Sequence, residues 1–178
     1  MRALTLQQSV DRCRGWARAE GSLYEAVGSW VASTPEPGPK IYFDACSQHH
    51  AWRATLWQQR LPEEGARDGA GLSPAATAAL SAVAGAGAAA KLAVYCRVVL
   101  ARAAIAYGAW RRQCSAASDR PVARALDIAK ADVMTDWIEG EELLQGLFST
   151  EQDALDAARA AGEAEALLVG HGLVLNAE

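Results

Sequence analysis

The segment from Lys40 to Pro62 limits the possible folds of this chain more than any other. It has no Gly, and its only Pro is the last residue. Large side chains return every three or four positions, which is the period of an amphipathic helix. The residues of this series are Ile41 or Tyr42, Ala45, His49, Trp52 and Leu56. The pattern predicts a helix with these residues toward the core and His50 at the edge of the interface.

Three further segments show the same period and predict long helices. The first runs from Leu4 to about Ser33, with a core-facing series of Val10, Cys13, Ala17, Glu20, Tyr24, Val27 and Val31. The second runs from Pro74 to about Cys114, and its continuity through Gly85-Ala86-Gly87 stays open. Its series is Leu92, Cys96, Val99, Ala103, Ala106 and Trp110. The third runs from Pro121 to about Phe148, through Leu126, Ala129, Val133, Asp136 or Trp137, Gly140, Leu144 and Leu147.

Breaker residues separate these segments into a simple order. Thr34–Pro39 is a Pro-rich connector, Glu63–Gly71 is a polar, Gly-rich loop, and Ser115–Arg120 is a turn. A capping box at Ser149–Gln152 predicts a shorter helix to about Val169. Ala is abundant, and no segment predicts a strand. Residues 1–178 are therefore expected to form one all-α domain, an up-down four-helix bundle with a short fifth C-terminal helix.

Charge and composition restrict the class of protein. The formal charge is −4 without a basic stripe, which argues against nucleic-acid binding. Five Lys/Arg and no acid lie within residues 74–118, whereas residues 119–165 carry twelve acids and four bases, so these two helices are expected to be neighbours. Four scattered cysteines indicate reduced thiols, and no signal peptide is recognisable, so a cytoplasmic location is expected. The Ala-rich tract from Leu72 to Ala90 is too weakly apolar to predict a membrane span.

Several ionisable residues fall within the predicted helices at positions that suggest a shared interior site. Carboxylates and histidines inside a helical bundle are the usual components of a metal centre. The candidates are Glu20, His49, His50, Asp132 and Asp136. With the helix order and the short terminal helix, this set resembles the ferritin-like superfamily. The resemblance implies that these residues would be metal ligands and that iron or another divalent metal would be the cofactor.

The chain also differs from the ligand pattern of that superfamily. A Glu-x-x-His motif needs a carboxylate three positions before the histidine, but Cys46 and Ser47 stand there. Thr135 and Glu139 replace the histidine expected after Asp132 and Asp136, and residues 74–114 contain no carboxylate.

Several other roles for the same residues stay open. His49 is expected to form a hydrogen bond with a carboxylate such as Glu20. Alternatively, Glu20 pairs with Arg102. Asp132 and Asp136 have Arg97 and Arg102 as available cations. A single-metal site formed by Glu20, His49 and Asp136, with Cys46 at its border, remains an alternative. Another alternative is that Cys46 is a nucleophile, with His49 beside it one turn later.

Two functional hypotheses follow from these residues. The preferred one is a non-catalytic bundle without a cofactor that acts through association, as a homodimer or as a subunit that supports a protein partner. An exposed Trp on the Lys40–Pro62 helix would mark such a contact. The alternative is a metal-dependent enzyme or metal-binding protein with a reduced ligand set. A weaker hypothesis is a small-ligand pocket, whose candidate lining residues are Tyr24, Trp52, Tyr95 and Arg102.

Overall fold

The computed structural model describes residues 4–62, 71–115 and 117–174. Within these ranges the chain is all-α, as predicted, and contains no strand beyond an isolated bridge between Leu72 and Val174. The predictions for the Glu63–Gly71 loop therefore lie mostly outside the described residues.

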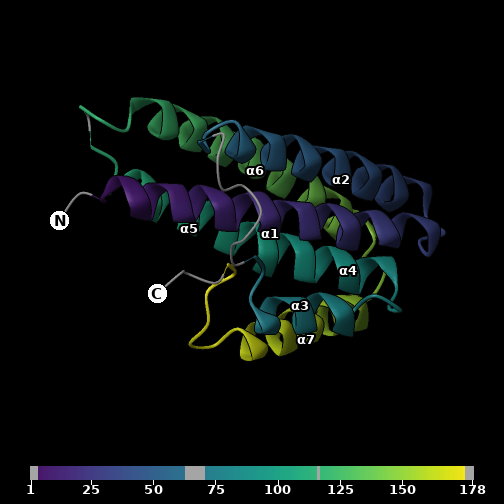
Figure 1. Cartoon of the computed structure of the whole chain (residues 1–178). Helices are drawn as coiled ribbons and strands as arrows, with labels where there is room; N and C mark the ends of the chain where they lie inside the picture. Colours follow the sequence, from purple (N-terminus) through teal and green to yellow (C-terminus); the bar gives the residue numbers. More distant parts are fainter. Residues whose placement is uncertain (1–3, 63–70, 116, 175–178) are drawn as a thin grey trace.

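The first two helices form an antiparallel pair. Helix α1 (Leu6–Ala32) begins with a capping box between Thr5 and Gln8. Helix α2 (Pro37–Gln58) begins with prolines in its first turn, where a backbone N–H would have no partner within the helix. The two helices lie side by side along their length (Figure 1). They therefore place residues from the first and second predicted helices in direct contact.

The segment predicted as one helix from Pro74 to Cys114 is two helices. Helix α3 (Pro74–Ala82) is separated by residues 83–87 from α4 (Ala88–Val94), which continues through a π-helical turn, η1 (Tyr95–Leu100), into α5 (Ala101–Arg111). The break thus includes Gly85-Ala86-Gly87, where the sequence left open whether the helix continues.

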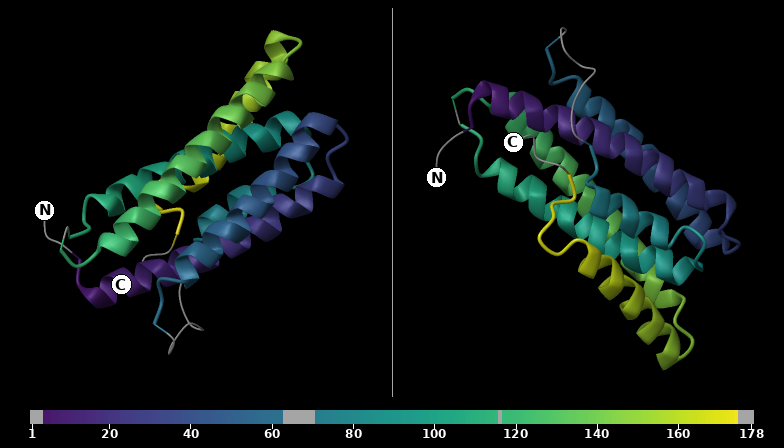
Figure 2. Two further views of the ribbon diagram at one scale, coloured as in Figure 1. Left: turned by 90° about the horizontal axis from the view of Figure 1, so that it is seen from above. Right: turned by 60° about the horizontal axis from the view of Figure 1, so that its bottom comes forward.

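The C-terminal part consists of α6 (Arg120–Gly146) and α7 (Glu151–Leu167). The capping box of α7 joins Thr150 to Asp153, one residue later than predicted. Helix α7 packs against α3 and α4, as Figure 2 shows from below. It forms an additional layer on the side of α4 away from α2.

The continuous helix Ala88–Arg111 lies in the interior and carries many of the buried apolar residues. It is also the one helix within the described residues that is long and apolar enough to cross a membrane. However, 67% of its apolar 18-residue segment is buried inside the protein. Such a helix is weak evidence for a membrane span, because the core helix of a soluble protein passes the same test.

Ion pairs confirm that the basic helix and the acidic helix are neighbours. Arg97 pairs with Glu141, and Arg111 pairs with Asp127, which joins η1 and α5 to α6. These pairs are partly exposed, so they are expected to add little stability.

The predicted core-facing side of α2 is correct at Tyr42 and Leu56, which are buried, but is displaced by one residue between them. The buried series is Phe43, Cys46, His50, Arg53 and Trp57, whereas Ile41 is 70% exposed and Trp52 is 46% exposed. The observed rotation buries Phe43 and Trp57 completely, and large aromatic side chains gain most from burial.

On α1 the predicted series is buried at Cys13, Ala17, Glu20 and Val27 but not at Tyr24. There Trp16, Leu23 and Trp30 are buried and Tyr24 is 42% exposed. The predicted core position of Tyr24 is therefore wrong, and Leu23, its neighbour, takes the interior place.

Candidate functional site

Arg53 lies at the centre of a buried network of charged side chains. It extends from α2 into the interior and has no exposed surface. Its Nε donates to Glu20 Oε2 on α1 at 3.2 Å, and its Nη1 donates to Asp136 Oδ2 on α6 at 3.0 Å. Nη1 also donates to Asp132 Oδ2. A single guanidinium therefore links carboxylates from two other helices.

Glu20 receives hydrogen bonds from three side chains on two other helices, α2 and α5. Besides Arg53, its Oε2 lies 2.5 Å from His50 Nδ1, and its Oε1 accepts from the hydroxyl of Tyr107 on α5. Burial by itself would raise the pKa of Glu20, but the charge of Arg53 and the donors on His50 and Tyr107 outweigh it and lower the pKa to about 2. Glu20 is therefore a carboxylate whose acceptor positions are occupied.

His50 connects Glu20 to η1. The hydroxyl of Tyr95 lies 2.8 Å from His50 Nε2, on the side of the ring opposite Glu20. Burial and the charge of Arg53 lower the pKa of His50 more than Glu20 and Asp136 raise it, so the ring is neutral at pH 7. We assign the proton to Nδ1, because that nitrogen then donates to Glu20 while Nε2 accepts from Tyr95.

His49 and Asp136 form the part of the network nearest the solvent. His49 Nδ1 lies 2.7 Å from Asp136 Oδ1, and its side chain is half-exposed whereas Asp136 is buried. The Cys46 thiol, one helical turn before His49, belongs to the same cluster. Burial, followed by the charge of Asp136, raises the pKa of Cys46, so the thiol is protonated at pH 7. A protonated thiol is a poor nucleophile, which weakens the Cys46–His49 alternative.

The π-helical turn brings two tyrosines to the same side of the interior helix. In a regular α-helix, residues twelve apart such as Tyr95 and Tyr107 point about 120° apart. The turn accommodates one extra residue and reduces that angle to about 20°. Both hydroxyls can therefore reach the network, Tyr95 at His50 and Tyr107 at Glu20.

The structure brings together all five residues predicted as metal ligands, but in different pairs from those expected. Glu20 contacts His50 rather than His49, and His49 contacts Asp136. The cation that neutralises the carboxylates is Arg53, whereas Arg97 and Arg102 pair with Glu141 and Glu165 at the surface. Sequence reasoning missed Arg53, although it follows His50 by three positions and lies on the same face of the helix.

The predicted pocket of Tyr24, Trp52, Tyr95 and Arg102 is not formed. Tyr24 and Trp52 are largely exposed, Arg102 is held at the surface by Glu165, and Tyr95 is buried. The expected face of α2 was wrong by one residue, and that error also placed Trp52 inside.

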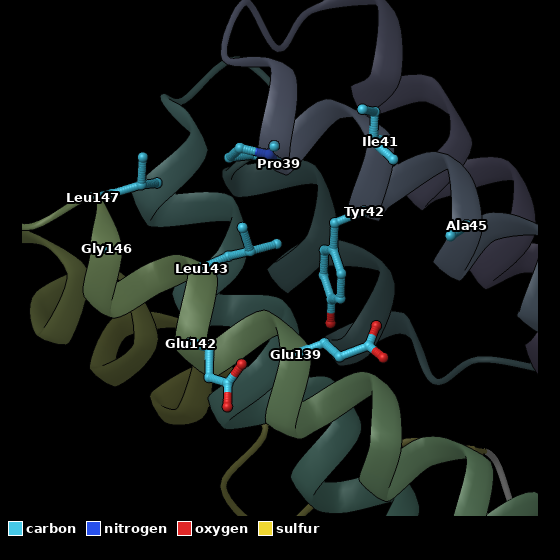
Figure 3. A pocket seen from close by; sticks show the side chains of 10 residues that line it. Pro39, Ile41, Tyr42, Ala45, Glu139, Glu142, Leu143, Gly146 and Leu147 are labelled. Atoms are coloured by element: carbon cyan, nitrogen blue, oxygen red, sulfur yellow. The ribbon is translucent and has the colours of Figure 1, made fainter.

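A groove lies between the first half of α2 and the last half of α6. Its volume is about 580 Å³, and the side chain of Tyr42 projects into it from α2 (Figure 3). Pro39, Ile41, Leu143 and Leu147 provide apolar lining, and Glu139 and Glu142 line it from α6. The hydroxyl of Tyr42 donates to the backbone oxygen of Asp136 at 2.6 Å, so the groove adjoins the buried network.

The residues present do not fit a two-metal site of the kind that the resemblance implies. Both oxygens of Glu20, which such a site would need as a ligand, already accept hydrogen bonds from Arg53, His50 and Tyr107. No protein-family model, no curated protein and no solved structure matches this chain.

Proposed function

We propose that this protein is a non-catalytic, ferritin-like helical bundle that acts by association through the surface formed by α2 and α6. In this arrangement α1, α2, the continuous helix α4–α5 and α6 are the four helices, and α3 and α7 are additional. The contact surface comprises Ile41, Ala45 and Trp52 on α2 and the groove between α2 and α6. A second copy of the chain is the proposed occupant.

The exposed stripe on α2 is the observation that carries this proposal. Ile41, Ala45 and Trp52 repeat at helical spacing along one side of α2 and are exposed. The apolar side of the groove is continuous with this stripe, because Ile41 also lines the groove. Apolar surface that gathers on one face of a soluble protein commonly marks a contact with another protein. A single stripe can also pair with its own copy about a two-fold axis.

The interior supports a structural role rather than a catalytic one. Arg53 satisfies Glu20 and Asp136, and the two tyrosines complete the remaining hydrogen bonds. Paired buried charges of this kind specify how helices fit together, whereas a metal-dependent enzyme would need the same carboxylates as ligands.

The oligomeric state tests this proposal. Size-exclusion chromatography with light scattering and analytical ultracentrifugation should give a dimer for the wild type at micromolar concentration. The double variant Ile41→Glu, Trp52→Glu should be a monomer with unchanged helix content, because both side chains are exposed. The matched control is Ile105→Glu on α5, since Ile105 is as exposed as Ile41 and lies on a different helix.

Two outcomes would contradict self-association. One is a wild-type protein that remains a monomer up to about 1 mM, where an association of even −4 kcal/mol would be visible. The other is a dimer that Ile105→Glu dissociates and the α2 double variant leaves intact. If the wild type is a monomer, the acidic side of the groove at Glu139 and Glu142 favours a partner with basic residues beside apolar ones.

A further inference from the structure

Three different donor groups lie close together at the end of the network that includes the half-exposed ring of His49. Cys46 and His49 are one turn apart on α2, and Asp136 faces them from α6. One sulfur, one nitrogen and one oxygen atom from these side chains all lie within 4.8 Å of one another. Thiolate, imidazole and carboxylate are the three side-chain ligands that Zn²⁺ uses.

We propose that Cys46, His49 and Asp136 bind a single transition-metal ion, with Zn²⁺ the best match to this ligand set. This site differs from the two-metal site considered above. It uses one carboxylate and a thiol, and Glu20, His50 and Asp132 are not ligands. A tetrahedral ion would have three protein ligands and a fourth position on the side of the half-exposed His49 ring.

The charge of the network favours a cation at this point. Glu20, Asp132 and Asp136 face one guanidinium, which leaves a formal charge of −2 when both histidines are counted as neutral. Glu20 and Asp136 are buried, so solvent screens their excess charge poorly. Among the described residues, Arg53 is the only Lys or Arg that forms an ion pair with these carboxylates. A dication bound by Asp136 and the Cys46 thiolate would reduce this formal charge of −2 to −1.

Binding needs a small rearrangement that the exposed ring permits. His49 Nδ1 and Asp136 Oδ1 are 2.7 Å apart, and tetrahedral ligands at about 2.0–2.2 Å from a metal lie about 3.4 Å from each other. The ring of His49 therefore turns outward, its proton moves to Nε2 through solvent, and Nδ1 binds the ion. The thiol of Cys46 releases its proton to solvent as the metal–sulfur bond forms.

Arg53 keeps a role in this arrangement as a positioning residue. Its Nη1 donates to Asp136 Oδ2, the oxygen that does not face His49. The carboxylate can therefore bind the ion through Oδ1 while Arg53 fixes its orientation, as residues behind metal ligands commonly do.

Titration of the metal-free protein with Co²⁺ tests the site, because tetrahedral Co²⁺ is coloured and a thiolate ligand adds a sulfur-to-metal charge-transfer band. One equivalent should bind with that band and should be displaced by Zn²⁺. Cys46→Ser should remove the band, and His49→Ala should weaken binding at least tenfold. The matched controls are Cys114→Ser and His171→Ala, which change another cysteine and another histidine and should bind like the wild type.

Circular dichroism shows whether each variant is folded, and His49→Ala is expected to fold because His49 is half-exposed. The proposal is wrong if the wild type binds no Co²⁺ at millimolar concentration. It is also wrong if the charge-transfer band survives Cys46→Ser or is lost in Cys114→Ser. The association proposal is tested on metal-free protein, so either can fail without the other.

Discussion

Arg53 is the residue on which the interior of this protein depends. It contacts carboxylates from α1 and α6, and none of its surface is exposed. A buried charge that loses its partner costs far more than a surface charge does, because no water replaces the lost contact. The interior is thus sensitive to single substitutions that would be harmless at the surface.

Replacing Arg53 with Met should destabilise the protein by about 3–5 kcal/mol, because Glu20 and Asp136 would be left buried without their cation. The control is Arg97→Met, which breaks the partly exposed pair with Glu141 and should cost no more than about 1 kcal/mol. Urea unfolding followed by circular dichroism measures both. Equal losses in the two variants would show that Arg53 does not have this role.

Stability should fall as the pH is lowered, and Glu20 is a main cause. Its pKa is about 2 in the folded protein and 4.5 in an unfolded chain, so its contribution is complete above pH 4.5 and is lost as the pH falls through 2. The loss amounts to about 3 kcal/mol. The lowered pKa of His50 acts in the same direction, because below pH 6.5 the unfolded chain takes up a proton that the buried ring resists.

Glu20→Gln should therefore reduce the dependence of unfolding free energy on pH between 4.5 and 2. Leu23→Ala is the control, since it destabilises the same helix at a fully buried apolar position and keeps the carboxylate. It should retain the wild-type slope in a series of urea titrations. An unchanged slope in Glu20→Gln would contradict the assignment of this titration to Glu20.

At the scale of the elements, α2 and α6 meet so closely that one position allows no side chain. The hydroxyl of Tyr42 and the thiol of Cys96 both lie against Gly140 of α6. Tyr42 donates from there to the backbone oxygen of Asp136. Gly140 therefore fixes the distance between α6 and two other helices.

Gly140→Ala should destabilise the protein by roughly 1–3 kcal/mol, because a Cβ would overlap both Tyr42 and Cys96 unless the helices move apart. Gly162→Ala on α7 is the matched control. It has no heavy atom within 4 Å of the added Cβ and should stabilise the helix by about 0.5–1 kcal/mol. Thermal unfolding separates the two, with opposite shifts in Tm expected. A rise in Tm for Gly140→Ala would show that the two helices are not held this closely.

At the scale of the whole molecule, the packing of the helices protects most of the cysteines. Cys13, Cys46 and Cys96 are buried, and Cys114 is half-buried. Burial raises the pKa of both Cys13 and Cys96 to about 12, so neither supplies thiolate at neutral pH. Their reactivity therefore reports on unfolding of the whole domain.

A thiol reagent at pH 8 should label at most one cysteine rapidly in the native protein, and Cys114→Ser should abolish that rapid phase. All four cysteines should react after unfolding in denaturant. The absorbance of the chromophore that the reagent releases gives the number of labelled cysteines. Rapid labelling of two or more cysteines in the native protein would contradict the single well-packed interior described here.

The sequence by itself determined most of the secondary structure and one pair of neighbouring helices. Breaker residues and capping signals set the approximate limits of the helices, because these signals act over a few residues. The separation of basic from acidic segments also predicted that α5 and α6 would be paired, since opposite charges in long segments favour adjacency.

Only the tertiary structure decided which side of α2 faces inward, whereas the predicted series on α1 and α6 are mostly buried. A shift of one residue rotates a helix by about 100°, so Phe43 and Trp57 compete with Ile41 and Trp52 for the interior, and the outcome depends on how the other helices fit. The same rotation brought Arg53 among the carboxylates and left His49 at the solvent side. The sequence predicted that these carboxylates and histidines share the interior. It did not predict how they pair or that Arg53 lies among them, because these contacts form only when four separate segments pack together.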